Sequence, residues 1–187
     1  IDKGSFSKVY ALECCSTKRR LAGKFICKEK LQRYGISNAV WNEIGIHRRL
    51  RHESIVQFLT YIEQRSHIII VLEYCSRYSM VHIIHSLKTL TAGEAKYFMI
   101  QVVSAVEYLH RNRIVHRDLK LGNLFVNKQF AIKLGDFGLA VAIEFDGQKR
   151  FSRCGTPNYI APEVINGVGH SYEVDVWALG CILHTML

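Results

Sequence analysis

The chain has only two prolines among its 187 residues and no long run of apolar residues. Its longest apolar stretches, Ile68–Leu72 and Val176–Leu187, fall short of the roughly 20 residues that a membrane span needs. With 49% hydrophobic and 22% charged residues, it is not a disordered tail, a collagen-like repeat or a low-complexity linker. No charged-then-apolar leader opens the sequence, so we expect no signal peptide. These absences predict a soluble globular chain with a core of its own.

The six cysteines lack the C-x-x-C spacing of a zinc site. A disulfide between the adjacent Cys14 and Cys15 would close a strained ring. Scattered cysteines in a chain of this size are typical of thiols in a reducing compartment. We therefore expect them to be buried or half-buried and structural.

Positive charge is in excess, with 25 Lys+Arg against 16 Asp+Glu and a formal net charge of +9. The basic residues alternate with apolar ones and form no long run, and the cluster at 18–20 is typical of a solvated turn. Such an excess suits nucleic acid, a nucleotide or an acidic peptide, so charge alone does not choose among these partners.

The first half of the chain shows short β-type runs broken by one helical stretch. Residues Val40, Ile44, His47 and Leu50 recur at steps of three and four, which predicts a helix over Asn38–Leu50. Short β-type runs separated by polar or basic turns predict strands over 8–13, 21–28, 55–63 and 67–73.

After residue 74 the pattern becomes helical. Thr91 and Glu94 have the spacing of a capping box, and one apolar face follows, formed by Phe98, Val102, Val106 and Leu109. Residues 113–161 are rich in Gly, Asp and Asn and predict only brief strands. A last apolar helix is predicted over Glu173–Leu187.

Five short motifs follow one another along the chain. They are Ala22–Lys24, Glu43, His116–Asn123, Asp136–Gly138 and Ala161–Glu163. This ordered set resembles the protein-kinase signature, and five motifs at these separations leave little room for another fold. The resemblance implies an α+β, two-lobed kinase fold, with a β-rich N-lobe over residues 1–74 and a mainly helical C-lobe over 75–187.

Three segments, 43–48, 111–125 and 154–163, resemble the polo-like kinases in particular. Lys120, two residues past Asp118, is the residue typical of serine/threonine kinases. The resemblance therefore implies a polo-like kinase that transfers the γ-phosphate of ATP to protein Ser or Thr hydroxyls, with a role in the cell cycle.

The resemblance also implies further helices beyond Leu187, so we expect an incomplete C-lobe. In the last helix, we expect Trp177, Leu179, Ile182 and Leu183 to lack packing partners. Kinases use the residue at Asp175 to tether the catalytic-loop backbone near His116.

The same resemblance gives four residues a catalytic role. Asp118 is the expected base toward the substrate hydroxyl, and Lys120 neutralises charge on the transferring phosphoryl group. Lys24 holds the α- and β-phosphates and forms an ion pair with Glu43. Any one of these residues taken alone could be a surface charge, and their joint occurrence favours function.

ATP and Mg²⁺ are the expected cofactors. Asn123 and Asp136 supply oxygen ligands of the kind that Mg²⁺ prefers. The first and third glycines of the kinase glycine loop are replaced by Asp2 and Ser7, which puts the affinity for ATP in question. The expected ATP-binding residues, several of which could equally be plain core, are Ile1, Gly4, Val9, Ala22, Lys24, Leu72, Glu73, Cys75 and Phe125.

Regulation is expected at Ser152, two residues before Cys154, where polo-like kinases carry an activating phosphorylated Thr. Arg117 is the expected partner of that phosphate, although Ser152 could also be a plain loop serine. Thr156 is expected to contact Asp118 and Lys120 instead.

The expected partners are proteins with Ser or Thr near acidic residues; we expect no nucleic acid, no membrane and a monomeric domain. By resemblance the protein is intracellular, in the cytoplasm and nucleus, with the centrosome or spindle as further sites. Two alternatives stay open. The altered glycine loop suggests a pseudokinase scaffold, and the net charge suggests a nucleic-acid module, although no aromatic–basic motif supports the latter.

Overall fold

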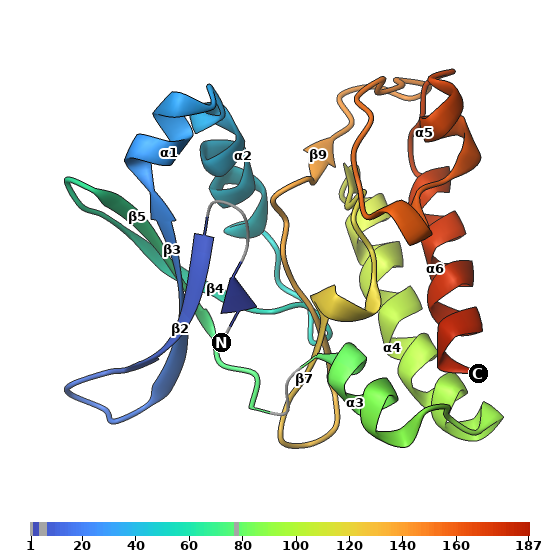
Figure 1. Cartoon of the computed structure of the whole chain (residues 1–187), viewed down its shortest axis with the longest axis horizontal. Coiled ribbons are helices and arrows are strands. Elements are labelled where there is room, and N and C mark those ends of the chain that lie inside the picture. Colours follow the sequence, from blue (N-terminus) through green and yellow to red (C-terminus); the bar gives the residue numbers. More distant parts are fainter. Residues whose placement is uncertain (1, 4–6, 77–78) are drawn as a thin grey trace.

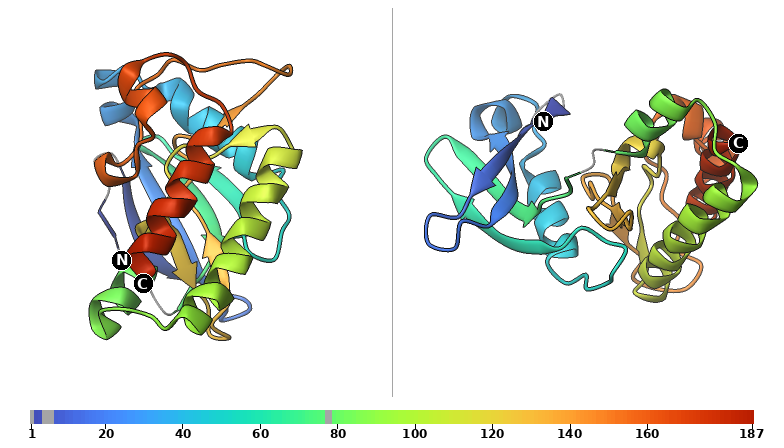
Figure 2. Two further views of the ribbon diagram at one scale, coloured as in Figure 1. Left: turned by 90° about the vertical axis from the view of Figure 1, so that its right-hand side faces the viewer. Right: turned by 90° about the horizontal axis from the view of Figure 1, so that it is seen from below.

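The computed structural model describes residues 2–3, 7–76 and 79–187, which form two parts (Figure 1). An antiparallel sheet with two helices makes up the first part, and the second part is mainly helical. The view from below separates the two parts most clearly (Figure 2). This two-lobed α+β arrangement confirms the predicted fold class.

Within the described residues, the sheet has five antiparallel strands in the order β1-β2-β3-β5-β4. The predicted strands are all present, but the one expected from residue 55 begins only at residue 58. Ile55 instead forms an isolated bridge with Leu134 of the second part, which takes it out of the sheet. The strands are β1 (Asp2–Lys3), β2 (Ser7–Glu13), β3 (Arg20–Cys27), β4 (Phe58–Glu63) and β5 (His67–Glu73).

The first part has two helices, α1 (Lys28–Arg33) and α2 (Ser37–His47), so the prediction of a single helical stretch is wrong. Helix α1 follows β3 directly, has no side-chain cap and buries one residue, Leu31, so its sequence signal is weak. The predicted apolar face of α2 is buried as far as Leu50. Although α2 itself ends at His47, a turn in which the Leu50 N–H is donated to the His47 carbonyl continues the buried face.

The second part has helices α3 (Met80–Leu87), α4 (Ala92–Arg111), α5 (Pro162–Asn166) and α6 (Glu173–Met186). Between α4 and α5 the chain forms only short elements, as the Gly-, Asp- and Asn-rich composition predicts. These are the antiparallel pairs β6 (Ile114–Val115) with β9 (Val141–Ala142) and β7 (Leu124–Val126) with β8 (Ile132–Leu134), and the 3₁₀ turns η1 (Leu121–Asn123) and η2 (Pro157–Tyr159).

Helix α4 forms the centre of the larger core. Its capping box is present: Thr91 Oγ1 accepts the Glu94 N–H at 3.3 Å, and Glu94 Oε2 accepts the Thr91 N–H at 2.8 Å. This pairing satisfies two of the N–H groups that a helix start leaves open. All four residues of the predicted face, Phe98, Val102, Val106 and Leu109, are buried in that core.

Helix α6 packs beside α4 and contributes to the same core (Figures 1 and 2). Ile182 is fully buried there and Leu179 packs against it, so the expectation that these two lack partners is wrong. Trp177 and Leu183 of the same helix are 49% and 39% exposed.

All six cysteines are free thiols. None of them is fully buried and Cys15 is exposed, so the expectation of buried or half-buried thiols is wrong for Cys15. Among the described residues, no helix has both the length and the apolarity needed to cross a bilayer.

Within the described residues, the backbone links the two parts at two places. One is residues 74–76, which follow β5 toward α3. The other is the loop after α2, where Val56 donates its N–H to the Leu134 carbonyl at 2.9 Å and Leu134 donates to the Ser54 carbonyl at 2.8 Å. The backbone thus fixes the loop 54–56 to β8 although it belongs by sequence to the first part.

Candidate active site

Lys24 and Glu43 face each other between the sheet and α2. Lys24 lies in the central strand β3, paired with Val9 on one side and Ile70 on the other. Its Nζ donates to Glu43 Oε1 at 2.7 Å, as expected, and also to Asp136 Oδ1 at 2.9 Å. The Lys24 and Glu43 side chains are only 14% and 7% exposed. A strand, a helix and a loop 112 residues away in sequence therefore meet at one ammonium group.

This ion-pair network fixes the charges of its members. Burial by itself would lower the pKa of Lys24, but the carboxylates of Glu43 and Asp136 outweigh burial and raise it above its ordinary value. Burial would likewise raise the pKa of Asp136, and Lys24 reverses the effect and lowers it. Lys24 is therefore an ammonium and Asp136 a carboxylate at neutral pH, whereas burial raises the pKa of Glu43 above its ordinary value. A lysine ammonium has three donors, so Lys24 keeps one beyond the two used here.

A pocket opens between the two parts beside Lys24. Of the residues that the sequence singles out, it is lined by Val9, Ala22, Lys24, Glu43, Leu72, Glu73, Cys75, Asn123, Phe125 and Asp136. Ile1 and Gly4 lie outside the described residues. Ser7, which replaces the third glycine of the expected glycine loop, also lines the pocket. The structure adds four lining residues to which the sequence assigns no role in binding: His47, Val56, Tyr74 and Gly135.

The segment after β5 forms one wall of this pocket. Glu73 is held by an ion pair with Lys133 at 3.1 Å, and its N–H is donated to the Gln57 carbonyl at 2.9 Å. Burial, followed by the nearby Glu73 carboxylate, raises the pKa of the Cys75 thiol to about 12. Cys75 therefore meets a ligand as a neutral thiol.

The catalytic-loop residues form a second network beside the pocket. Lys120 Nζ donates to Asp118 Oδ2 at 2.9 Å, and Thr156 Oγ1 donates to Asp118 Oδ1 at 2.7 Å. Lys120 also donates to Thr156 Oγ1 at 2.8 Å, so the expected contacts of Thr156 are present. Asn123 Nδ2 donates to the Asp118 carbonyl at 2.8 Å and links this network to the pocket. The Asp118 side chain is 10% exposed, and its hydrogen bonds fix the carboxylate in position.

Two residues of the site have backbone angles that L-residues rarely adopt. The φ angles are +65° at Arg117 and +61° at Asp136. Such left-handed angles persist only where the surroundings enforce them, and they gather at functional sites. Asp175 provides part of that support, because its carboxylate accepts the N–H groups of His116 and Arg117, each at 2.9 Å. The expected tether of the catalytic loop is therefore present.

The Asn123 and Asp136 side chains fit a divalent cation. The Asn123 amide nitrogen is used within the loop, which leaves its carbonyl oxygen as the group available to a ligand. Both residues line the pocket, and the Asp136 side chain is 45% exposed and ionised. Within the described residues, no group of three or more His, Cys, Asp or Glu could hold a metal. Phosphate and water oxygens would supply the further ligands of a cation held by Asn123 and Asp136.

Ser152 lies within reach of Arg117. Arg117 Nη1 donates to Ser152 Oγ at 2.5 Å, and Arg117 Nε donates to the Leu139 carbonyl at 2.8 Å. The second contact fixes the guanidinium, so its position does not depend on Ser152. A group added to the Ser152 hydroxyl would meet an oriented cation.

A contact between three rings connects the pocket to the catalytic loop. The centroids of His47 and Phe137 are 4.5 Å apart, and those of Phe137 and His116 are 5.2 Å apart. His47 Nε2 lies 2.7 Å from the Val56 carbonyl, and since a carbonyl only accepts, Nε2 carries the proton. The sequence places His47 on the buried face of α2 but gives no sign of this stack.

A family model described as "Protein kinase domain" matches residues 1–187. The chain belongs to the protein kinase domain family. Among curated proteins, this kinase domain is 45% identical to "Serine/threonine-protein kinase polo" of Drosophila melanogaster over 99% of the chain and 32% of that relative. It is also 45% identical to "Serine/threonine-protein kinase PLK2" of Mus musculus over 100% of the chain and 27% of the relative. With "Probable serine/threonine-protein kinase CCRP1" of Zea mays it shares 47% identity over 100% of the chain and 30% of the relative. The kinase domain thus spans about a third or less of the length of these relatives.

Proposed function

We propose that the chain is the catalytic part of a polo-like serine/threonine protein kinase, which transfers the γ-phosphate of ATP to Ser or Thr hydroxyls of proteins. The observation that carries this proposal is the junction of two networks. Lys24, Glu43 and Asp136 meet at the pocket, and Asn123 joins that pocket to Asp118. Phosphoryl transfer depends mainly on positioning and charge neutralisation, which such paired networks supply.

In this proposal each side of the junction has a separate task. Lys24 directs its remaining N–H toward the α- and β-phosphates while Glu43 fixes its position. Mg²⁺, held by Asn123 and Asp136, supplies neutralisation of phosphate charge when bound. Asp118 accepts the proton of the substrate hydroxyl, and Lys120 neutralises charge on the group in transfer.

We assign the nucleotide base to the apolar residues of the pocket, near residue 74, where the N-lobe joins the C-lobe. Val9, Ala22, Leu72 and Phe125 line the pocket, as do Glu73 and Cys75, whose backbone would bind the adenine edge. Ile1 and Gly4 are assigned to the same site by resemblance alone. The apolar share of this wall is what a nucleotide base requires.

Regulation and substrate choice complete the proposal. Phosphorylation of Ser152 would add two negative charges beside Arg117, where the guanidinium is already oriented. By analogy with the named relatives, we place the kinase in the cell cycle, inside the cell, with protein substrates that carry acidic residues near the target Ser or Thr. This basic chain, of formal net charge +9, suits such substrates.

The test is transfer of radiolabelled phosphate from ATP to dephosphorylated casein, an acidic protein rich in Ser. We expect transfer that Asp118→Asn abolishes. The matched control is Asp146→Asn, because the Asp146 side chain is 91% exposed and its one ion pair among the described residues is with Arg113. Nucleotide binding by thermal shift, with no transfer above the Asp118→Asn variant, would favour the pseudokinase scaffold instead.

A further inference from the structure

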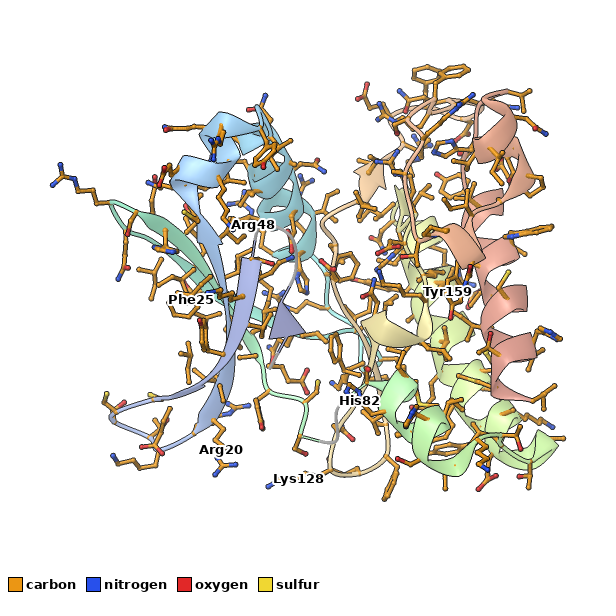
Figure 3. All side chains as sticks on the ribbon, in the orientation of Figure 1. Arg20, Phe25, Arg48, His82, Lys128 and Tyr159 are labelled. Carbon is orange, nitrogen blue, oxygen red and sulfur yellow. The ribbon has the colours of Figure 1, made fainter. Side chains whose placement is uncertain are left out.

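Three cations surround a groove on the outer side of the segment that connects the two parts. Arg19 and Arg20 come from the end of the β2–β3 turn, and Lys128 comes from the β7–β8 turn. Tyr74 and Ser76 of the connecting segment lie between them. Figure 3 shows Arg20 and Lys128 at the same lower edge of the molecule. We infer that this basic groove binds an acidic segment of a partner protein.

Both turns that present the cations are held by backbone hydrogen bonds. In the β2–β3 turn, Cys14 donates its N–H to the Arg19 carbonyl at 2.9 Å, and Arg20 is in register opposite Glu13. In the β7–β8 turn, Asn127 Oδ1 accepts the N–H groups of Gln129 and Ala131 at 3.0 and 2.9 Å. A ligand therefore meets cations on ordered backbone, which lowers the entropy cost of binding.

No carboxylate among the described residues neutralises the cations of the basic groove. Arg19, Arg20 and Lys128 make no ion pair with any residue in the part of the chain that the structure describes. The one carboxylate lining the groove, Glu73, is already paired with Lys133. Three exposed, unpaired cations at one groove repel one another, and an acidic ligand removes that repulsion.

The floor of the groove offers a further polar contact. Ser76 Oγ is buried and has no hydrogen-bond partner among the described residues. A buried hydroxyl without a partner costs free energy, and a carboxylate or carbonyl oxygen of a ligand would satisfy it. Arginine guanidinium groups bind carboxylates in a bidentate manner, so Asp and Glu side chains match this set of donors.

The basic groove and the nucleotide pocket share two residues. Glu73 and Tyr74 line both, on opposite sides of the connecting segment. The docking inference itself depends only on the cations and Ser76, and it stands independently of kinase activity. A bound acidic segment would contact the same backbone that forms the wall of the pocket.

The test is binding of a fluorescein-labelled peptide of eight glutamates to the nucleotide-free chain, measured by fluorescence anisotropy at low salt. The groove variant is Arg20→Glu with Lys128→Glu. The matched control is Arg33→Glu with Arg48→Glu, which makes the same change of charge at exposed positions at the ends of α1 and α2; Arg48 is labelled in Figure 3. A neutral pair, Arg20→Gln with Lys128→Gln, serves if the reversed charges impair folding.

We expect the groove variant to bind the peptide roughly tenfold more weakly and the control to stay within about twofold of the original chain. The neutral pair should fall between them. If both charge-reversed variants weakened peptide binding equally, the inference would be overturned, because binding would then depend only on the net charge of the chain. The absence of peptide binding would also overturn it, as would tighter binding of a single-stranded oligonucleotide than of the peptide at this groove.

Discussion

Asp175 holds the backbone of His116: its Oδ2 accepts the His116 N–H at 2.9 Å, while Oδ1 accepts that of Arg117. His110 Nε2 lies 2.9 Å from the same carboxylate, which is 1% exposed. The catalytic loop therefore depends on a buried acceptor in α6, 59 residues away in sequence.

Asp175→Asn should destabilise the chain by about 2 kcal/mol, because an amide NH₂ would face an N–H donor at a buried site. Urea unfolding followed by circular dichroism measures the change. Glu173→Gln is the control, since Glu173 is exposed on the same helix and its acceptor Oε1 is kept. Equal stability of Asp175→Asn and the original chain would contradict the assigned tether.

Lys24→Met and Asp136→Asn should each reduce phosphoryl transfer by more than about 100-fold, because each removes a charge that the transition state needs. Radiolabel transfer to casein measures the rate. Lys28→Met serves as the control, because Lys28 lies one residue past β3 and pairs with Glu63 away from the pocket. Near-original turnover in either test variant would overturn the assignment of the pocket.

Thr156→Val should lower kcat on the order of 10- to 100-fold, because the Asp118 carboxylate loses one of its three side-chain donors, and the one that binds Oδ1. The KM for ATP should stay unchanged, because Thr156 does not line the nucleotide pocket. Thr156→Ser keeps the hydroxyl and should keep most of the rate. A rise in KM without a change in kcat would place Thr156 in binding and not in orientation.

Acid should destabilise the chain through His47. Burial lowers the pKa of His47 to about 4 from its ordinary 6.5, so between these values the unfolded chain binds a proton that the folded chain does not. Stability is therefore complete above pH 6.5 and falls as the pH drops toward 4, by about 3 kcal/mol in total.

Denaturation midpoints measured across this pH range check the contribution of His47. His47→Gln should flatten the profile, although it lowers stability at neutral pH. His85→Gln, at an exposed position of α3, should leave the slope as it is. An unchanged slope in His47→Gln would show that other groups cause the acid sensitivity.

Iodoacetamide should alkylate Cys14 well before Cys75. Hydrogen bonds from the side chains of Ser16 and Thr17 lower the pKa of Cys14 to about 6, whereas burial raises that of Cys75 to about 12. At pH 7, about 90% of Cys14 is then the reactive thiolate, against a negligible share of Cys75. Peptide mapping of a Cys15→Ser variant separates the neighbouring sites, and faster labelling of Cys75 would contradict the assigned environments.

Local patterns predicted much of the fold. The continuous β-branched and apolar run in His67–Glu73, with a polar residue at each end, predicted the full bounds of β5, and the Thr91–Glu94 spacing predicted the start of α4. Helix α1 was missed because it is six residues long, uncapped and joined directly to β3. The β4 strand was begun too early because Ile55 pairs with a strand that lies 79 residues further on.

The candidate site was predictable only where local motifs name its residues. Motif resemblance named Lys24, Asp118 and Asp136, and the structure brings Lys24 and Asp136 together. Ser76 and His47 carry no such signal. Their importance comes from a missing hydrogen bond and from a ring stack, and both depend on segments that are distant in sequence.

The two backbone connections between the parts, at residues 74–76 and at the pairing of Val56 with Leu134, define an axis. A relative rotation of the sheet and the helices is easiest about the line through both connections, since any other rotation breaks one of them. Val56 and Glu73–Cys75 line the pocket, so both connections contribute to its wall. Lys24 belongs to the sheet and Asp136 to the second part, and their ion pair joins the two parts across the pocket. Rotation of the parts away from each other about this axis would break that ion pair and keep both backbone connections.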